Sequence, residues 1–142
     1  MKKTIIWACA LLVVGSITLI SCGKYDEGPG LSLRSKTGRL AGDWKVEKST
    51  VSNALGSINN TATYDGYTWT FEKDGAATFK YGAFTSVATW KFNDDKSIVI
   101  MTYSVTGSVD SMPLTRLTNK EFWTKEVYGG STEERHFVAH GH

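Results

Sequence analysis

Residues 67–81 read Tyr-Thr-Trp-Thr-Phe-Glu-Lys-Asp-Gly-Ala-Ala-Thr-Phe-Lys-Tyr and carry the clearest structural signal of the chain. Apolar and polar side chains alternate on both sides of Lys73-Asp74-Gly75. A period of two indicates half-buried strands, because successive side chains of a strand point to opposite faces. Asp-Gly accepts the positive φ of a tight turn. The stretch therefore predicts a β-hairpin with its aromatic rings on one face.

The same alternation recurs between Leu40 and Ala139. We expect strands at residues 40–47, 67–72, 77–81, 88–92, 97–103, 110–117, 121–127 and 132–139. Residues 51–62 show no clear pattern, so a longer loop with room for one short helical turn is expected there. About eight short strands joined by tight turns are typical of an antiparallel sandwich or an up-and-down barrel. Because closure removes exposed edges, we predict an all-β fold, a small antiparallel up-and-down β-barrel.

The first 21 residues have the features of a signal peptide, with basic Lys2 and Lys3 before an almost wholly apolar run, Ile5–Ile20. The run is shorter than the ~20 residues that span a bilayer. Leu19-Ile20-Ser21-Cys22 resembles the lipobox of bacterial lipoproteins, which implies cleavage before Cys22 and addition of acyl chains such as palmitate to it. An outer-membrane protein held by its N-terminal lipid is therefore expected. A single-pass anchor, or an ordinary signal with a chance cysteine, is the alternative.

Residues 22–39 are polar and contain Gly28-Pro29-Gly30, which breaks regular structure. We interpret them as the lipidated cysteine and a flexible tether, followed by one barrel domain at residues 40–142. Residues 24–27, Lys-Tyr-Asp-Glu, resemble the acidic signal that exports some lipoproteins to the cell surface. This favours the surface over the periplasmic face of the outer membrane, although solvated linker charge is the alternative.

Charge and cysteine content exclude several classes of protein. Loss of Lys2 and Lys3 lowers the 16 basic side chains to the number of acidic ones, 14, so the formal charge falls from +2 to zero. A neutral domain lacks the basic stripe that nucleic-acid binding requires. Cys9 would leave with the signal and Cys22 would carry lipid, so the domain has no thiol for a disulfide or a metal.

Gly42-Asp43-Trp44 resembles the Gly-x-Trp motif on the first strand of the lipocalins. Residues 71–75, 90–92, 117–118 and 121–123 are closer to the short lipocalin-like domains of bacterial surface lipoproteins, and the resemblance spans residues 40–139. It implies a barrel in which Gly42 and Trp44 are structural and Trp44 closes the base. It also implies that a late arginine packs across this ring, with Arg135 as the first choice and Arg116 as the second. Unlike the full-length lipocalins, the chain shows no disulfides and no clear C-terminal helix.

The aromatic residues of the expected inward face form the candidate ligand site. They are Trp44, Tyr67, Trp69, Phe71, Phe79, Tyr81, Trp90, Phe92 and Tyr103. An eight-stranded barrel is wide enough either to be filled by its own side chains or to hold one small ligand. The first hypothesis is a pocket for a small apolar ligand, in which Tyr67, Tyr81 and Tyr103 supply polar groups. The alternative is a packed core, in an interaction module that serves as accessory subunit of an outer-membrane or cell-surface complex.

Metal and enzyme chemistry are not expected. His136 and His140 lie ~13 Å apart on one strand, so they cannot share an ion with Glu133 and Glu134 there. There is no Gly-x-Ser-x-Gly motif and no cysteine nucleophile in the domain. The acidic residues alternate with lysines, and we expect them to lie on the solvated outer face. We predict a non-enzymatic protein without cofactor.

Overall fold

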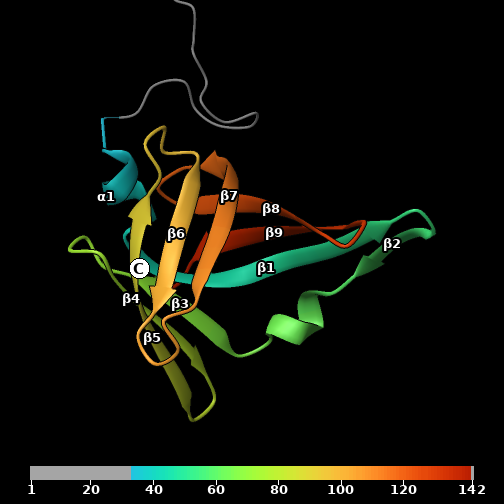
Figure 1. Cartoon of the computed structure of the whole chain (residues 1–142), viewed down its shortest axis with the longest axis horizontal. Coiled ribbons are helices and arrows are strands. Elements are labelled where there is room, and N and C mark those ends of the chain that lie inside the picture. The colour runs from blue at the N-terminus through green and yellow to red at the C-terminus, as the bar shows by residue number, and fades with distance from the viewer. Residues whose placement is uncertain (1–32, 142) are drawn as a thin grey trace, which may run out of the picture.

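Nine antiparallel strands form one sheet in the computed structural model, which describes residues 33–141 (Figure 1). The sheet order is β2-β1-β3-β4-β5-β6-β7-β8-β9, and pairing of β1 with β9 closes it into a barrel of eight strands with β2 outside. The elements are α1 Lys36–Leu40, β1 Gly42–Asn53, β2 Gly56–Asn59, the 3-10 helix η1 Thr61–Tyr64, β3 Tyr67–Phe71, β4 Ala76–Tyr81, β5 Phe84–Phe92, β6 Ile98–Tyr103, β7 Val109–Leu117, β8 Glu121–Tyr128 and β9 Ser131–Ala139. The predicted up-and-down β-barrel is confirmed.

The central hairpin is β3 and β4, which pair with Trp69 opposite Phe79. The turn between them is held by Asp74, whose Oδ1 accepts a hydrogen bond from the Ala76 backbone N–H at 3.0 Å. Gly75 follows with φ +95°. The predicted Asp-Gly turn therefore forms where the sequence places it.

Two stretches differ from the sequence-based expectation. The expected loop at residues 51–62 was wrong, because β1 continues to Asn53 and turns back into β2. The expected short helical turn there is confirmed as η1. The last residues of the expected tether form α1, in which Ser35 caps the helix by accepting from the Gly38 N–H at 3.0 Å. Within residues 33–141 no helix has the length and apolar character needed to span a membrane.

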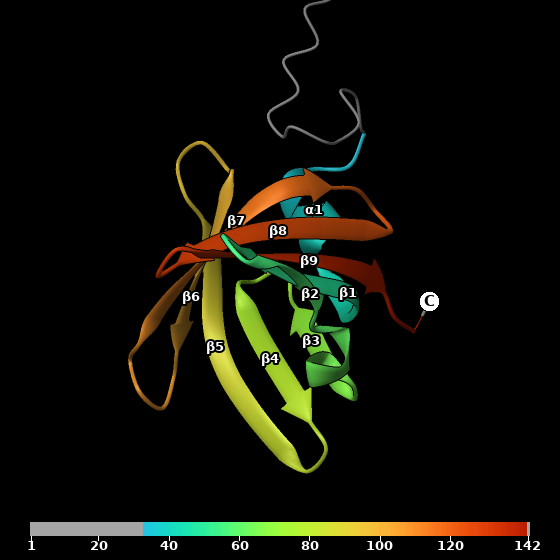
Figure 2. The same ribbon diagram turned by 90° about the vertical axis from the view of Figure 1, so that its right-hand side faces the viewer.

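The helix α1 lies at one end of the barrel, which we name the closed end (Figures 1 and 2). Trp44 is buried there and donates its indole N–H to the Leu40 carbonyl at 2.8 Å. Its ring also contacts Phe122 edge-on at a centroid distance of 4.8 Å. Arg39 donates to the Leu117 carbonyl at 3.0 Å and ties the helix to β7. The expected closing role of the tryptophan is therefore supported by these contacts.

The buried apolar core fills the closed half of the barrel. It is formed by Leu40, Trp44, Phe71, Ala77, Ala88, Trp90, Val99, Met101, Met112, Leu114, Leu117, Phe122 and Phe137. At its centre the rings of Phe122 and Phe137 stack at 4.2 Å with an interplanar angle of 13°. Offset stacking of this kind adds ~0.5–1.5 kcal/mol to the gain from burial alone.

Two irregularities change which residues face inward. The register of β1 against β9 shifts between Val46 and Lys48, and that of β7 against β8 shifts between Leu114 and Arg116. One extra residue in a strand moves every following side chain to the other face. Ser49 is therefore buried, although it would face outward if the alternation set by Trp44 continued.

Gly75→Ala should destabilise the protein more than Gly82→Ala. A Cβ on Gly75 would lie 3.2 Å from the Trp90 carbonyl oxygen, and the φ of +95° is one that side chains rarely adopt. Gly82, at φ +55°, has open space around its Cβ position. We expect both variants to lose about 1 kcal/mol for the left-handed backbone, and Gly75→Ala to lose more because of the contact. Urea denaturation measures the difference, and equal losses would contradict the argument.

Candidate functional site

The other end of the barrel, the open end, carries the β1–β2, β4–β5, β6–β7 and β8–β9 connections. Several side chains near this end face inward by register but are exposed to solvent, including Tyr81 on β4, Asp110 on β7 and Tyr128 on β8. These inward-facing side chains therefore contact solvent at this end. By contrast, the inward side chains of the closed half are buried.

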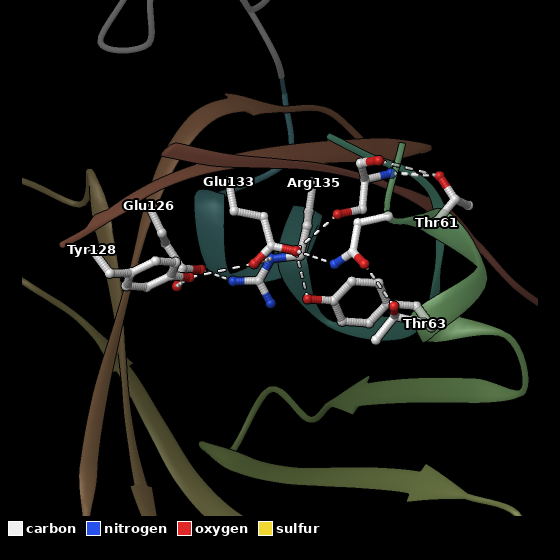
Figure 3. Close-up of polar contacts among 9 residues, drawn as sticks. Thr61, Thr63, Glu126, Tyr128, Glu133 and Arg135 are labelled. Carbon is white, nitrogen blue, oxygen red and sulfur yellow. Dashed lines mark hydrogen bonds and ion pairs between the residues drawn. The ribbon is translucent and has the colours of Figure 1, made fainter. Parts of the chain in front are cut away.

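A group of polar side chains lies between the open end and the apolar core (Figure 3). We name it the polar cluster, and it consists of Ser49, Asn60, Tyr64, Glu126, Tyr128, Glu133 and Arg135. Arg135 and Glu126 are each 7% exposed and Glu133 is 8% exposed. Charged groups this deeply buried are rare unless they are paired.

Glu133, on β9, accepts hydrogen bonds from three different segments at its Oε1 atom. The Tyr64 hydroxyl donates at 2.7 Å, the Ser49 hydroxyl at 2.8 Å and the Asn60 amide at 3.4 Å. These contacts join β9 to β1 and to η1. The bulge in β1 is what brings Ser49 to this carboxylate.

Glu126 and Arg135 form the second part of the cluster. A guanidinium Nη2 of Arg135 pairs with Glu126 Oε1, and the Tyr128 hydroxyl donates to Glu126 Oε2 at 2.6 Å. Arg135 Nε lies 3.9 Å from Glu133 Oε2. One cation thus stands between two buried carboxylates on neighbouring strands.

Aromatic rings surround the guanidinium. Its central carbon lies 5.5 Å from the ring centroid of Trp69 and 5.7 Å from that of Tyr64. Cation–π contacts of this length contribute ~0.5–2 kcal/mol, with the larger values at desolvated sites. The guanidinium of Arg135 therefore covers one face of the Trp69 ring and one face of the Tyr64 ring.

Three buried polar atoms next to this guanidinium have no hydrogen-bond partner within residues 33–141: Arg135 Nε, Trp69 Nε1 and Thr124 Oγ1. Thr124 is the register partner of Arg135 on β8, and Trp69 lies beneath the guanidinium. A buried donor without a partner costs ~1–3 kcal/mol. Among residues 33–141 the other such atom is Arg39 Nε in α1, so most of the unused hydrogen-bonding capacity lies on Arg135, Trp69 and Thr124.

One side of the polar cluster lies at the barrel wall, where β1 and β3 separate. They pair at Gly42, Asp43 and Trp44, after which η1 fills the space between them. A groove of about 430 Å³ runs along this junction, and Tyr64 is among its lining residues. Tyr64 thus contacts the groove on one side and Glu133 on the other.

The cluster shifts the ionisation of its tyrosines. Burial, then the hydrogen bond to Glu133, raises the pKa of Tyr64 to about 12. Burial, then the charge of Glu133, raises the pKa of Tyr128 to about 12. Burial and the charge of Asp110 also raise the pKa of Tyr103, and burial lowers the pKa of Arg135. The tyrosines therefore remain neutral donors at physiological pH.

These shifts predict a loss of stability at high pH. A tyrosine whose pKa is raised from 10.0 to about 12 stabilises the fold fully below pH 10, and this contribution is lost as the pH rises toward about 12. Titration of tyrosinate absorbance should show a late component near pH 12, and Tyr64→Phe and Tyr128→Phe should each reduce it. Tyr64→Phe should also flatten the fall in the free energy of unfolding above pH 10. Titration of every tyrosine near pH 10 would contradict this prediction.

The predicted inward aromatics divide into three groups. Trp44, Phe71 and Trp90 are fully buried in the core. Trp69, Phe79, Phe92 and Tyr103 are partly buried and pack against it. Tyr67 and Tyr81 lie toward the open end, where their rings stack at 4.4 Å. Tyr67 and Tyr81 therefore belong to the rim of the open end and not to the barrel interior.

The expected contact of Arg135 with Trp44 was wrong. Arg135 pairs with Ser49 on β1, and Ser49 lies five residues beyond Trp44, a distance of ~15 Å along the strand. Arg135 instead contacts Trp69 and Tyr64. The second choice, Arg116, lies 5.0 Å from the Trp123 ring and pairs with Glu121.

The expectation that the acidic residues lie outside was wrong for Glu126 and Glu133. Glu126 shares a face with Phe122 on β8, and Glu133 shares a face with Phe137 on β9. The sequence did contain a signal, because Glu133, Arg135 and Phe137 alternate along one strand and must therefore share its inward face. The prediction missed it because charged residues were assigned to the solvent by their type and not by their position in the strand.

The histidines lie away from this cluster. His136 stacks on Trp123 at 4.0 Å, and the two residues are register partners on β9 and β8. His140 follows β9 and donates its backbone N–H to the Asp43 carbonyl. Among residues 33–141 no group of three or more His, Cys, Asp or Glu side chains is arranged to hold a metal ion. The predictions for Cys22 and the rest of residues 1–32 lie outside the described residues.

No protein-family model matches the sequence, and no curated protein matches it either. Two solved structures are similar in fold. One is a lipocalin-like protein from Bacteroides uniformis, with a TM-score of 0.51 and 14% identity over 72% of this chain and 99% of that one. The other is a DUF4847 family protein from Bacteroides vulgatus, with a TM-score of 0.51 and 13% identity over 73% of this chain and 96% of that one. The fold is therefore a lipocalin-like β-barrel.

Proposed function

We propose that this protein is a non-enzymatic binding protein that holds a small, largely apolar ligand at the open end of its barrel. The observation that carries the proposal is the combination of accessible inward aromatic rings with unpaired donors around Arg135. Ligand sites are typically apolar concave surfaces with a few polar groups that fix orientation. The lipocalin-like fold of the two similar structures is compatible with this role.

The arrangement of the two glutamates favours binding over catalysis. Both oxygens of Glu126 are engaged, one by Arg135 and one by Tyr128. Glu133 accepts from Tyr64 and Ser49 at one oxygen and faces Arg135 with the other. A general acid or base needs a proton position that a substrate can reach. These carboxylates hold the barrel strands together instead.

The binding proposal is tested with the mature polypeptide carrying Cys22→Ala, after circular dichroism has verified its β-sheet content. Titration with octanamide, a neutral molecule with an apolar chain, should change the tryptophan fluorescence in a saturable way. Tyr81→Ser, at the rim, should weaken the binding while leaving the fold intact. Absence of any saturable change with octanamide and with charged compounds of the same chain would refute the proposed function.

We further propose that the protein is anchored in the outer membrane by acyl chains on Cys22, on the cell surface rather than the periplasmic face. The lipobox-like residues 19–22 and the acidic residues 24–27 support this location. Two or more acyl chains anchor a protein stably, whereas one is marginal. Wild-type protein should incorporate labelled palmitate and fractionate with membranes, and Cys22→Ala should do neither. A variant that remains membrane-bound would refute the anchor.

A second candidate function, an accessory subunit of a cell-surface complex, is favoured by a different observation. Most exposed large apolar side chains lie in the open-end connections or at the adjoining strand ends: Leu55, Ile58, Tyr81, Phe84, Val105, Val109, Val127 and Tyr128. Exposed apolar residues gathered in one region are typical of interaction surfaces. Crosslinking from position 84 in intact cells should then trap one defined membrane-protein partner. Recovery of the same complexes from a position at the closed end would count against this role.

A further inference from the structure

We propose that the site takes a ligand whose polar group is neutral and accepts hydrogen bonds, such as an amide, ester or hydroxyl, and that this group binds beside Arg135. This inference rests on the proposed binding function and specifies its ligand class. Trp69 Nε1 and Thr124 Oγ1 supply the hydrogen bonds, while Arg135 Nε faces Glu133 Oε2.

The unused capacity of the cluster is on the donor side. The carboxylates of Glu126 and Glu133 already accept hydrogen bonds or ion pairs at all four oxygens. The indole N–H of Trp69 and the hydroxyl of Thr124 have no partner in the described part of the chain. A ligand acceptor would recover the cost of these unpaired donors, whereas a ligand that only donates would find the nearby acceptors occupied.

The charges of the site select against anionic groups. Glu126 and Glu133 outnumber the single cation of Arg135, and the charge of Asp110 acts on Arg135 and on Tyr103. An additional anion would therefore be repelled, because like charges at short range in a desolvated site cost several kcal/mol. A cation such as an ammonium group only donates hydrogen bonds, so it would leave Trp69 Nε1 unpaired.

Aromatic rings next to Arg135 offer an apolar surface. Trp69 contacts Phe79 at 5.1 Å, and Phe79 contacts Tyr103 at 5.7 Å, which gives a continuous aromatic surface toward the open end. The Nε1 atom of Trp69 and the Oγ1 atom of Thr124 are both covered, so binding requires the partly buried indole to turn before the acceptor reaches them. The polar group would enter first and the apolar chain would lie against these rings.

The experiment compares three compounds with the same chain: octanamide, octanoate and octylammonium. Isothermal titration of the mature Cys22→Ala polypeptide should give an affinity for octanamide at least about tenfold higher than for either ion. Equal or tighter binding of octanoate or octylammonium would overturn the ligand class but leave the binding function standing. No binding of any of the three would refute the binding function itself.

Two variants that remove one donor each, the second of them isosteric, test the donors. Trp69→Phe and Thr124→Val should each weaken octanamide binding by about two- to tenfold, the value of one hydrogen bond. Trp123→Phe, on the outer face beside His136, is the matched control and should bind normally. Thr124→Val should also raise the stability of the unliganded protein, because it removes an unpaired buried hydroxyl. Unchanged octanamide affinity in both donor variants would overturn the proposal.

Discussion

Arg135→Met is expected to lower the free energy of unfolding by about 3–5 kcal/mol, because it leaves two buried carboxylates without their cation. Arg135 pairs with Glu126 and faces Glu133, and the side chains of all three are about nine-tenths buried. The loss is a large fraction of the ~5–15 kcal/mol by which a domain is usually stable. Urea denaturation of the two proteins at neutral pH measures it.

Two further variants separate charge from packing in this prediction. Arg135→Met combined with Glu126→Gln removes one of the uncompensated charges and should recover part of the lost stability. Arg116→Met breaks the ion pair with Glu121, whose side chains are about one-third exposed, and should cost no more than ~1 kcal/mol. If Arg135→Met cost as little as Arg116→Met, the ion pairs of the polar cluster would not stabilise the fold.

Phe137→Ala is the second large effect, with an expected loss of about 3–5 kcal/mol. Phe137 is fully buried, stacks on Phe122 at 4.2 Å and contacts Trp69 at 4.9 Å. Its removal leaves a cavity among rings that β3 and β8 hold in place. Because Trp69 also borders the polar cluster, the variant should weaken octanamide binding as well.

Phe84→Ala is the matched control for this substitution. Phe84 begins β5 at the open end and is 79% exposed, so its loss should change the stability by no more than about 0.5 kcal/mol. Chemical denaturation followed by tryptophan fluorescence compares the two variants. A loss below about 1 kcal/mol for Phe137→Ala would mean that the core collapses around the missing ring.

The strands were predictable because their alternation is strong where one face is buried. The expected strands from Tyr67 to Ala139 overlap β3 to β9, and the Asp-Gly and Gly-Gly turns lie between strands as expected. Alternation does not predict which side chains are buried beyond a bulge. There the following side chains switch to the other face of the sheet, although the residue types do not change. For this reason β1 was expected to end before Ser49, the residue that the bulge turns toward Glu133.

The polar cluster was less predictable than the aromatic core. Trp44 and Phe71 were assigned correctly to the interior because large rings rarely face solvent on a regular strand. Arg135 was singled out from the sequence, but with the wrong ring as its partner. Its true neighbours depend on the register between β9 and β1 and on the position of η1, which joins segments far apart in the chain. Hydrophobic periodicity contains no information about such long-range pairing.

The position of α1 has a consequence for how the protein would stand on a membrane. The chain enters the barrel through this helix, at the end opposite the β4–β5 turn (Figure 2). With an anchor at Cys22, the segment leading from the bilayer would attach to the base of the barrel, at the end opposite the mouth. This attachment would leave the mouth free to exchange a bound molecule with the surrounding medium or with a neighbouring protein.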